Sequence, residues 1–285
     1  MGTRIATAIV LIAIVMLWLF VADYPIFTIG ALAAYAVAAN ELAPLLGFKN
    51  RWPFLIVAAM GASLCFFFAP PGLYVTDVIP QWVNYLMVLS LVFWVAMFPL
   101  VKVFPTYSGF WTRPGVNFAF GLILLLPFLM ALLVLRSHHF AADYNSGAYL
   151  LLSVMVLVWA ADSGAYFTGR AMGKNKLIPA VSPNKTREGL YGGLVLALLA
   201  LSLIDYFGFF GDYGNDKLAL TLAGIAAILF SVEGDLVESM LKRHAGIKDS
   251  GRIFPGHGGM LDRIDSQLAA LPCFLGLHFI LERLA

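Results

Sequence analysis

Nine apolar segments of membrane-spanning length occupy most of this 285-residue chain. An α-helix needs about 20 mostly apolar residues to cross the hydrocarbon core of a bilayer. Inside that core each segment must satisfy its own backbone polar groups, which a helix does. The sequence therefore predicts an all-α, polytopic membrane bundle of about nine transmembrane helices. The segments lie near residues 5–22, 26–46, 53–69, 83–103, 117–135, 148–168, 188–207, 217–233 and 266–282.

The composition agrees with a membrane protein and excludes an ordinary soluble domain. Charged residues make up 12% of the chain and hydrophobic residues 61%, whereas soluble domains carry about 25% charged residues. The two cysteines, Cys65 and Cys273, lie inside apolar segments and form neither a disulfide framework nor a metal motif. The first apolar segment has no good cleavage site after it, so an uncleaved helix is expected rather than a signal peptide.

The basic residues predict how the chain is oriented in the membrane. Lysine and arginine are enriched in cytoplasmic loops. If the N-terminus is cytoplasmic, nine spans place most of the 18 lysine and arginine residues on that side. The same arrangement puts the two most polar segments, 168–188 and 233–265, together on the cytoplasmic side.

The most polar stretch of the chain, residues 231–265, combines both signs of charge with glycines at close spacing. Carboxylates can hold a hard cation, and lysine or arginine can hold phosphate. The glycines around His257 would let backbone amides approach a ligand closely. The acidic residues are Glu233, Asp235, Glu238, Asp249, Asp262 and Asp265, and the basic ones are Lys242, Arg243, Lys248, Arg252 and Arg263.

Helical spacing predicts that some of these charges share a face. Asp235, either Glu238 or Ser239, and Lys242 recur at one side of a helix, and Asp262 and Asp265 share a face at the start of the last segment. Two helices could therefore present carboxylates to one cation, and oxygen ligands favour Mg²⁺ or Ca²⁺. A simple salt bridge between Glu238 and Lys242 is the alternative interpretation of that spacing.

Three polar features lie upstream of this stretch. Asp162 follows a strongly apolar run, which suggests contact with protein or a watery cavity, and either a stabilising or a substrate-binding role. Ser182, Lys185 and Thr186 surround a Ser-Pro turn and could cradle phosphate, or they could form an ordinary basic loop. Glu41 lies in the second apolar segment, where a carboxylate is a candidate functional group. Because the cytoplasmic end of the segment is close, we favour the alternative that its carboxylate reaches the membrane interface.

The pattern SMLKRHAGIKDSGRIFPGHGGMLDRID, residues 239–265, resembles the signature of the phosphatidate cytidylyltransferase (CDP-diacylglycerol synthase) family. Two upstream segments, WAADSGAYFTGR and SPNKTREG, also look like family segments. The resemblance covers roughly residues 159–270. It implies a reaction of CTP with phosphatidic acid that gives CDP-diacylglycerol and pyrophosphate and requires Mg²⁺, with a second cation left open.

The resemblance also implies roles for individual residues. The expected catalytic residues are Asp235, Lys242, Arg243, Lys248, Asp249, His257, Asp262 and Arg263. The expected substrate-binding residues are Asp162, Ser182, Lys185, Thr186, Ser239, Gly256, Gly258 and Gly259. The expected metal ligands are Asp235, Asp262 and Asp265.

The setting and partners follow from the same resemblance. We expect a homodimer in the bacterial cytoplasmic (inner) membrane, with the active site facing the cytoplasm and no nucleic-acid partner. Residues 1–147 would be a transmembrane scaffold and residues 148–285 the catalytic region. Two alternatives remain: a CTP-dependent polyprenol or phytol kinase, and a cation-coupled transporter. A transporter would predict broken helices in both halves of the chain, whereas the polar groups here concentrate in the C-terminal half.

Overall fold

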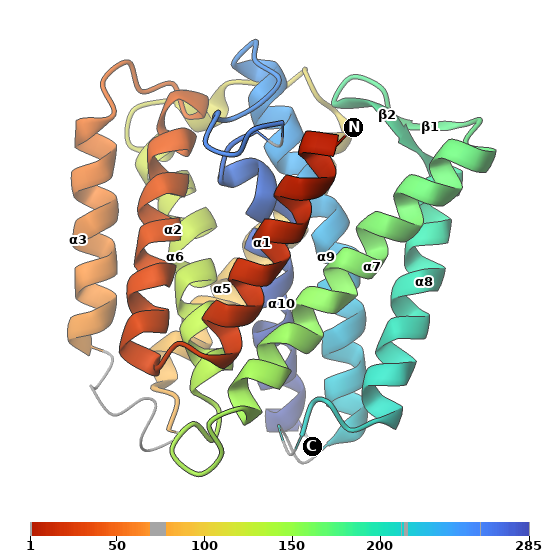
Figure 1. Ribbon diagram of the computed structural model, residues 1–285. Helices are drawn as coiled ribbons and strands as arrows, with labels where there is room; N and C mark the ends of the chain where they lie inside the picture. Colours follow the sequence, from red (N-terminus) through yellow and green to blue (C-terminus); the bar gives the residue numbers. More distant parts are fainter. Residues whose placement is uncertain (1, 69–77, 212, 214–215, 257, 285) are drawn as a thin grey trace. The chain divides into compact units, whose positions relative to one another are not determined.

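The computed structural model describes residues 2–68, 78–211, 213, 216–256 and 258–284, leaving the side chains of residues 2–6 and 8 undescribed. In these ranges the chain is almost entirely helical (Figure 1). Its α-helices are α1 (Gly2–Phe20), α2 (Tyr24–Leu45), α3 (Trp52–Phe68), α5 (Gln81–Lys102), α6 (Val116–Ser137), α7 (Ser146–Met172), α8 (Arg187–Tyr206), α9 (Lys217–His244) and α10 (Leu261–Leu284). A short 3-10 helix, η1, covers Phe110–Thr112, and strands β1 (Lys176–Ile178) and β2 (Ser182–Thr186) form an antiparallel hairpin.

The predicted all-α, multi-pass architecture is confirmed, because each of the nine apolar segments corresponds to a described helix. Seven helices, α2 and α5 to α10, are long and apolar enough to cross a membrane. The apolar parts of α1 and α3 are shorter. The largest differences from the sequence prediction concern α9, which continues beyond residue 233 to His244, and α10, which begins at Leu261. Residues 236–243 are mostly good helix formers, so the helix extends past the apolar run.

Helix ends are defined by polar groups at several places. The Asp23 side chain accepts a hydrogen bond from the Ile26 amide at 2.9 Å and caps α2. Thr186 caps α8 in the same way, accepting from the Gly189 amide at 3.1 Å. Basic residues occupy the last turn of α9 and Asp262 the first turn of α10, which matches the sign of each helix dipole.

The chain divides into two compact units, each assembled from segments that are distant in the sequence. Unit 1 contains Met1–Ile79, Gly109–Ala148 and Leu241–Ile264; unit 2 contains Pro80–Ser108, Tyr149–Met240 and Asp265–Ala285. Helices α9 and α10 therefore contribute to both units. The proposed division into a scaffold and a catalytic region at residues 147 and 148 is a functional one and stays a prediction.

In unit 1, helix α2 packs against α3 and α6, as Figure 1 shows. Two buried tyrosines of α2 reach across these contacts. The Tyr35 hydroxyl donates to the Ala58 carbonyl at 2.9 Å, and the Tyr24 hydroxyl donates to the Leu133 carbonyl at 3.1 Å. These bonds tie α2 to both neighbours, and so fix the helix that carries Glu41.

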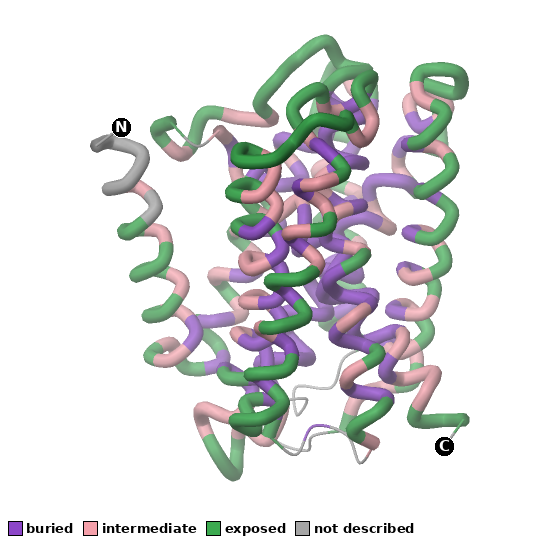
Figure 2. The backbone as a smooth tube through the Cα atoms, turned by 90° about the vertical axis from the view of Figure 1, so that its right-hand side faces the viewer, coloured by how far each residue is buried: buried purple, intermediate pink, exposed green. Residues whose placement is uncertain are grey.

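In unit 2, helices α7 and α8 are joined by the β-hairpin and approach each other closely. A Cβ atom at Gly164 would lie 2.7 Å from the Gly192 carbonyl oxygen, so only glycine permits this approach. Figure 2 shows that buried residues follow one side of many helices, whereas the connecting loops are mostly exposed. The hairpin lies between the C-terminal end of α7 and the N-terminal end of α8. Its strand β2 carries three of the predicted substrate-binding residues.

Candidate active site

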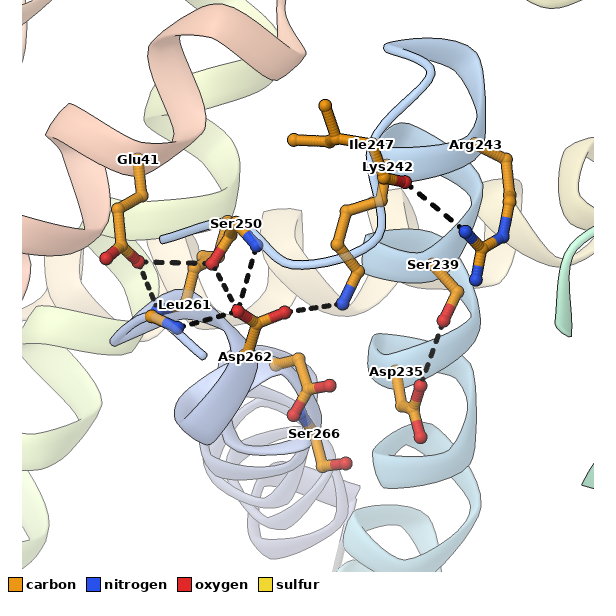
Figure 3. A network of polar contacts seen from close by, with 12 residues as sticks. Glu41, Asp235, Ser239, Lys242, Arg243, Ile247, Ser250, Leu261, Asp262 and Ser266 are labelled. Carbon is orange, nitrogen blue, oxygen red and sulfur yellow. Dashed lines mark hydrogen bonds and ion pairs between the residues drawn. The ribbon is translucent and has the colours of Figure 1, made fainter. Parts of the chain in front are cut away.

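Asp262, in the first turn of α10, is the most heavily hydrogen-bonded carboxylate of the predicted site (Figure 3). Its Oδ1 lies 2.6 Å from the Lys242 ammonium. Its Oδ2 accepts from the Ser250 amide at 2.9 Å and from the Gly259 amide at 2.8 Å, and lies 2.9 Å from the Ser250 hydroxyl. A carboxylate offers about four lone-pair positions. Four donors therefore surround Asp262, whose side chain is only 5% exposed.

Glu41 approaches the same segment from α2, and the expectation that it reaches the membrane interface is wrong. The residue is 4% exposed. Its Oε2 accepts from the Leu261 amide at 2.8 Å and lies 3.2 Å from the Ser250 hydroxyl. The carboxylate turns toward the protein because it finds hydrogen-bond donors there, which lower the cost of burying it.

A second Lys–Asp pair lies in unit 2. Lys185 of β2 and Asp235 of α9 are 2.6 Å apart, and both side chains are 27% exposed. The other oxygen of Asp235 accepts from the Ser239 hydroxyl at 3.2 Å, one helical turn further along (Figure 3). The predicted shared face of Asp235 and Ser239 is thus confirmed. The pair also joins the hairpin to α9, two segments that the sequence analysis treated separately.

The hairpin that presents Lys185 is closed by Glu188 in the first turn of α8. The Glu188 carboxylate accepts from the Asn175 side-chain amide at 2.6 Å and from the backbone amides of Lys174 and Asn175 at 3.1 Å. Within the hairpin, Ser182 is paired with Ile178. The two strands of the hairpin are therefore joined at the turn and also at the open end, and Lys185 belongs to β2 between these two points.

Asp265 lies next to the close approach of α9 and α10 within unit 2. A Cβ atom at Gly234 would collide with the Asp265 carbonyl oxygen, so the backbones meet directly at this point. One carboxylate oxygen of Asp265 accepts from the neighbouring Ser266 amide at 2.8 Å. Gly234, the residue before Asp235, thus lies against the backbone of Asp265.

The remaining predicted residues lie mainly on exposed parts of the chain. Arg243 donates to the Ile247 carbonyl at 3.3 Å, and Asp162 is exposed on α7. Gly256 and Gly258 have positive φ angles of 75° and 80°, which favour glycine. His257 lies outside the described residues. Exposed side chains are also found at Lys248, Asp249 and Arg263.

A magnesium ion requires oxygen ligands in near-octahedral geometry. Among the described residues, no three His, Cys, Asp or Glu side chains gather into a group that could hold a metal by themselves. Mg²⁺, however, is usually bound by one or two carboxylates together with substrate phosphates. The half-exposed Asp235 fits such a shared site, whereas Asp262 would first have to release one of its four donors.

Sequence analysis missed three residues that organise the site: Ser250, Glu188 and Asn175. Ser250 lay within the recognised pattern but was not singled out, although a hydroxyl between charged residues is a usable signal. Glu188 at a helix start follows a basic turn, which is typical of a capping acid. Its contact with Asn175, thirteen positions away, has no local sequence signal.

Comparisons with known proteins extend the resemblance over nearly the whole chain. The model of the cytidylyltransferase family matches residues 2–281. A phosphatidate cytidylyltransferase of Haemophilus influenzae is 38% identical over 287 residues, covering 97% of this chain and 98% of that protein. One from Pseudomonas aeruginosa is 40% identical over 275 residues, covering 96% and 95%. One from Staphylococcus haemolyticus is 48% identical over 134 residues, covering 47% and 50%. The predicted family resemblance is confirmed.

Proposed function

The chain belongs to the cytidylyltransferase family, and we propose that it transfers the cytidylyl group of CTP to phosphatidic acid, giving CDP-diacylglycerol and pyrophosphate. The observation that carries this proposal is the half-exposed Lys185–Asp235 pair beside Ser239. In this pair, the Lys185 ammonium could bind a phosphate and the Asp235 carboxylate could bind a cation at the same place. The chain is a multi-pass membrane protein, so a lipid substrate can reach its site from the bilayer.

The proposed reaction needs positioning more than a strong base. A phosphomonoester has a second pKa of about 6, so the phosphate of phosphatidic acid is largely dianionic near neutral pH. One of its oxygens attacks the α-phosphorus of CTP. The bond from that phosphorus to the oxygen bridging to the β-phosphate breaks, and pyrophosphate leaves with the electron pair. Repulsion between the anionic reactants is the main barrier, so electrostatic stabilisation should dominate.

The basic residues would neutralise different parts of this charge. Lys185 is partly exposed and can turn from Asp235 toward a phosphate oxygen. Lys242 is held at Asp262, and would act on a phosphate from that fixed place. Lys248, Arg243 and Arg263 are exposed and would bind the outer phosphates of CTP.

We propose Mg²⁺ as the accompanying cation, held by Asp235 and Asp265 together with CTP phosphates. When bound there it would neutralise phosphate charge as pyrophosphate departs. Asp235 retains lone pairs beside its contacts with Lys185 and Ser239. Asp262 stays a predicted third ligand, and a second cation stays an open proposal.

A purified-protein assay tests the reaction directly. Protein in lipid–detergent micelles is given CTP labelled at either the α- or the γ-phosphate, with and without Mg²⁺, and with either phosphatidic acid or a polyprenol as the acceptor. The proposed reaction places the α-label in CDP-diacylglycerol and the γ-label in pyrophosphate. Transfer of the γ-label to a lipid alcohol would instead identify a CTP-dependent kinase and overturn the proposal.

The cytoplasmic orientation of the site is also a proposal, supported by the distribution of basic residues and by bacterial relatives with an inner membrane. A cysteine introduced at Lys176 or Arg252 should be protected from an impermeant thiol reagent in intact cells. Both should react once the membrane is opened. Labelling of both positions from outside would reverse the orientation.

We retain the homodimer as a further proposal, resting on the family resemblance alone. Cross-linking in native membranes, followed by mass determination of the purified complex, should detect two copies of the chain. A single copy under conditions that preserve activity would contradict it.

A further inference from the structure

Glu41 occupies an unfavourable place for a carboxylate. It is almost fully buried, near the C-terminal end of α2, where the helix dipole is negative. A buried charge in such a position is costly unless specific donors compensate it. The compensation comes from Leu261, whose amide is one of the free donors at the start of α10, and from the Ser250 hydroxyl. Glu41 therefore contacts both Ser250 and Leu261, which begin and end the described residues 250–256 and 258–261 that we call the glycine segment.

The glycine segment is shaped to receive this carboxylate. A Cβ atom at Gly251 would collide with Glu41 Oε1, and a Cβ atom at Gly259 would collide with both carboxylate oxygens. Neither glycine has a positive φ angle, so backbone strain does not explain their identity. The need for glycine at both positions comes from contact with Glu41. Among the described residues, the buried Oε1 has no hydrogen-bond partner.

Contacts of the glycine segment connect Glu41 to Asp262 and Lys242. The Ser250 hydroxyl lies between the carboxylates of Glu41 and Asp262, and its single proton serves one of them at a time. The Ser250 and Gly259 amides both bond to Asp262, and Lys242 is paired with that carboxylate. A displacement of Glu41 would therefore move the donors that fix Asp262 (Figure 3).

We propose that Glu41 is a positioning residue that holds the glycine segment, and through it Asp262 and Lys242, in the arrangement required for cytidylyl transfer. The inference rests on the proposed function. Glu41 is too buried to touch a substrate, so it acts by alignment rather than by chemistry. Removing it should lower kcat more than it raises the KM for CTP. Misplacement of about 1 Å can reduce a rate on the order of 10²-fold, which is the loss expected for Glu41→Ala.

Three variants separate alignment from other effects. Glu41→Ala removes the acceptor of the Leu261 amide. Glu41→Gln keeps one oxygen that can accept from that amide and should recover most of kcat. Gly251→Ala adds a methyl group that displaces the Glu41 carboxylate. Gly251 is not a predicted substrate-binding residue, so this variant should reproduce the kinetic loss of Glu41→Ala through displacement alone. The matched control is Asp23→Ala, which removes the cap at the other end of α2 and leaves the glycine segment untouched.

Hydrogen exchange supplies a readout that does not depend on the reaction. Glu41→Ala should accelerate amide exchange in the glycine segment and leave the 176–186 hairpin unchanged, whereas Asp23→Ala should leave both unchanged. Wild-type kcat in Glu41→Ala, unchanged exchange in the glycine segment, or an equal kcat loss in Asp23→Ala at a similar Tm would each overturn the proposal. Failure of the wild-type protein to convert CTP and phosphatidic acid would instead overturn the proposed function. The exchange measurement would still decide whether Glu41 anchors the segment.

Discussion

The two Lys–Asp pairs have the same separation but very different surroundings. Lys242–Asp262 in unit 1 and Lys185–Asp235 in unit 2 are both 2.6 Å apart. The side chains of the first pair are 11% and 5% exposed, and those of the second are both 27% exposed. Asp262 also accepts from three groups of the glycine segment, whereas Asp235 accepts from one hydroxyl.

This difference in burial suggests different roles for the two pairs. A buried, fully hydrogen-bonded pair cannot easily exchange its partners, because an unpaired charge would be left in a poorly solvated place. A half-exposed pair exchanges partners at little cost. We therefore expect Lys242–Asp262 to maintain the shape of the site and Lys185–Asp235 to open toward substrate and cation.

The largest expected effect comes from breaking the buried pair. Lys242→Ala leaves Asp262 without its ammonium partner, and such a loss typically costs about 3–5 kcal/mol of stability. Lys185→Ala breaks the partly exposed pair and should cost roughly 1 kcal/mol or less. Denaturant unfolding of both variants in detergent measures the difference. Equal destabilisation would remove the distinction between the pairs.

Asp235→Asn should reduce turnover strongly while the protein stays folded. Loss of one electrostatic stabiliser lowers kcat on the order of 10²-fold. Raised Mg²⁺ should restore part of the activity of Asp235→Asn, because weaker cation binding is overcome by concentration. Asp262→Asn should be rescued less, since besides any contact with the cation it weakens the contacts with Lys242 and two backbone amides. Rescue of both variants, with a double variant no worse than either, would show that the two carboxylates hold one cation jointly.

Lys248→Ala tests whether exposed charge near the glycine segment binds substrate. A charge-assisted hydrogen bond contributes roughly 1.5–3 kcal/mol, so kcat/KM should fall by about 10- to 150-fold. Arg252→Ala is the control, because Arg252 is exposed in the same loop and outside the predicted site. Steady-state kinetics in CTP would compare them. Wild-type kinetics in Lys248→Ala would assign this lysine to the basic membrane surface alone.

The smallest effect is expected for Glu188→Ala, which removes the hydrogen bonds between the Glu188 carboxylate and residues 174 and 175 at the open end of the hairpin. Lys185 would keep its charge, but the strand that carries it would be held less firmly. The KM for CTP should therefore rise a few-fold, with little change in stability. Lys176→Ala is the control for Glu188→Ala, because it removes a charge from the same hairpin and leaves the hydrogen bonds of Glu188 in place. Identical KM values in both variants would mean that the hairpin does not need Glu188 to present Lys185.

Much of this protein could be predicted from its amino-acid order. Apolar length identified the nine α-helices of the described residues, since the hydrocarbon core imposes a minimum span and allows no unpaired backbone. Fixed polar spacing in residues 239–265 identified the family, which the comparisons confirmed. Helical spacing also placed Asp235 and Ser239 on one face. These features depend on local patterns, which a linear sequence displays directly.

Only the tertiary structure decided which charges are partners. Helical spacing offered Lys242 only Glu238, a neighbour on the same helix, and gave no sign that its ammonium lies 2.6 Å from Asp262, twenty positions away. It suggested an interfacial Glu41, yet this carboxylate is buried against Ser250 and Leu261, 209 and 220 positions away. A buried charge is stabilised by whichever donors the fold brings within about 3 Å, and no local periodicity encodes contacts between segments so distant in the chain.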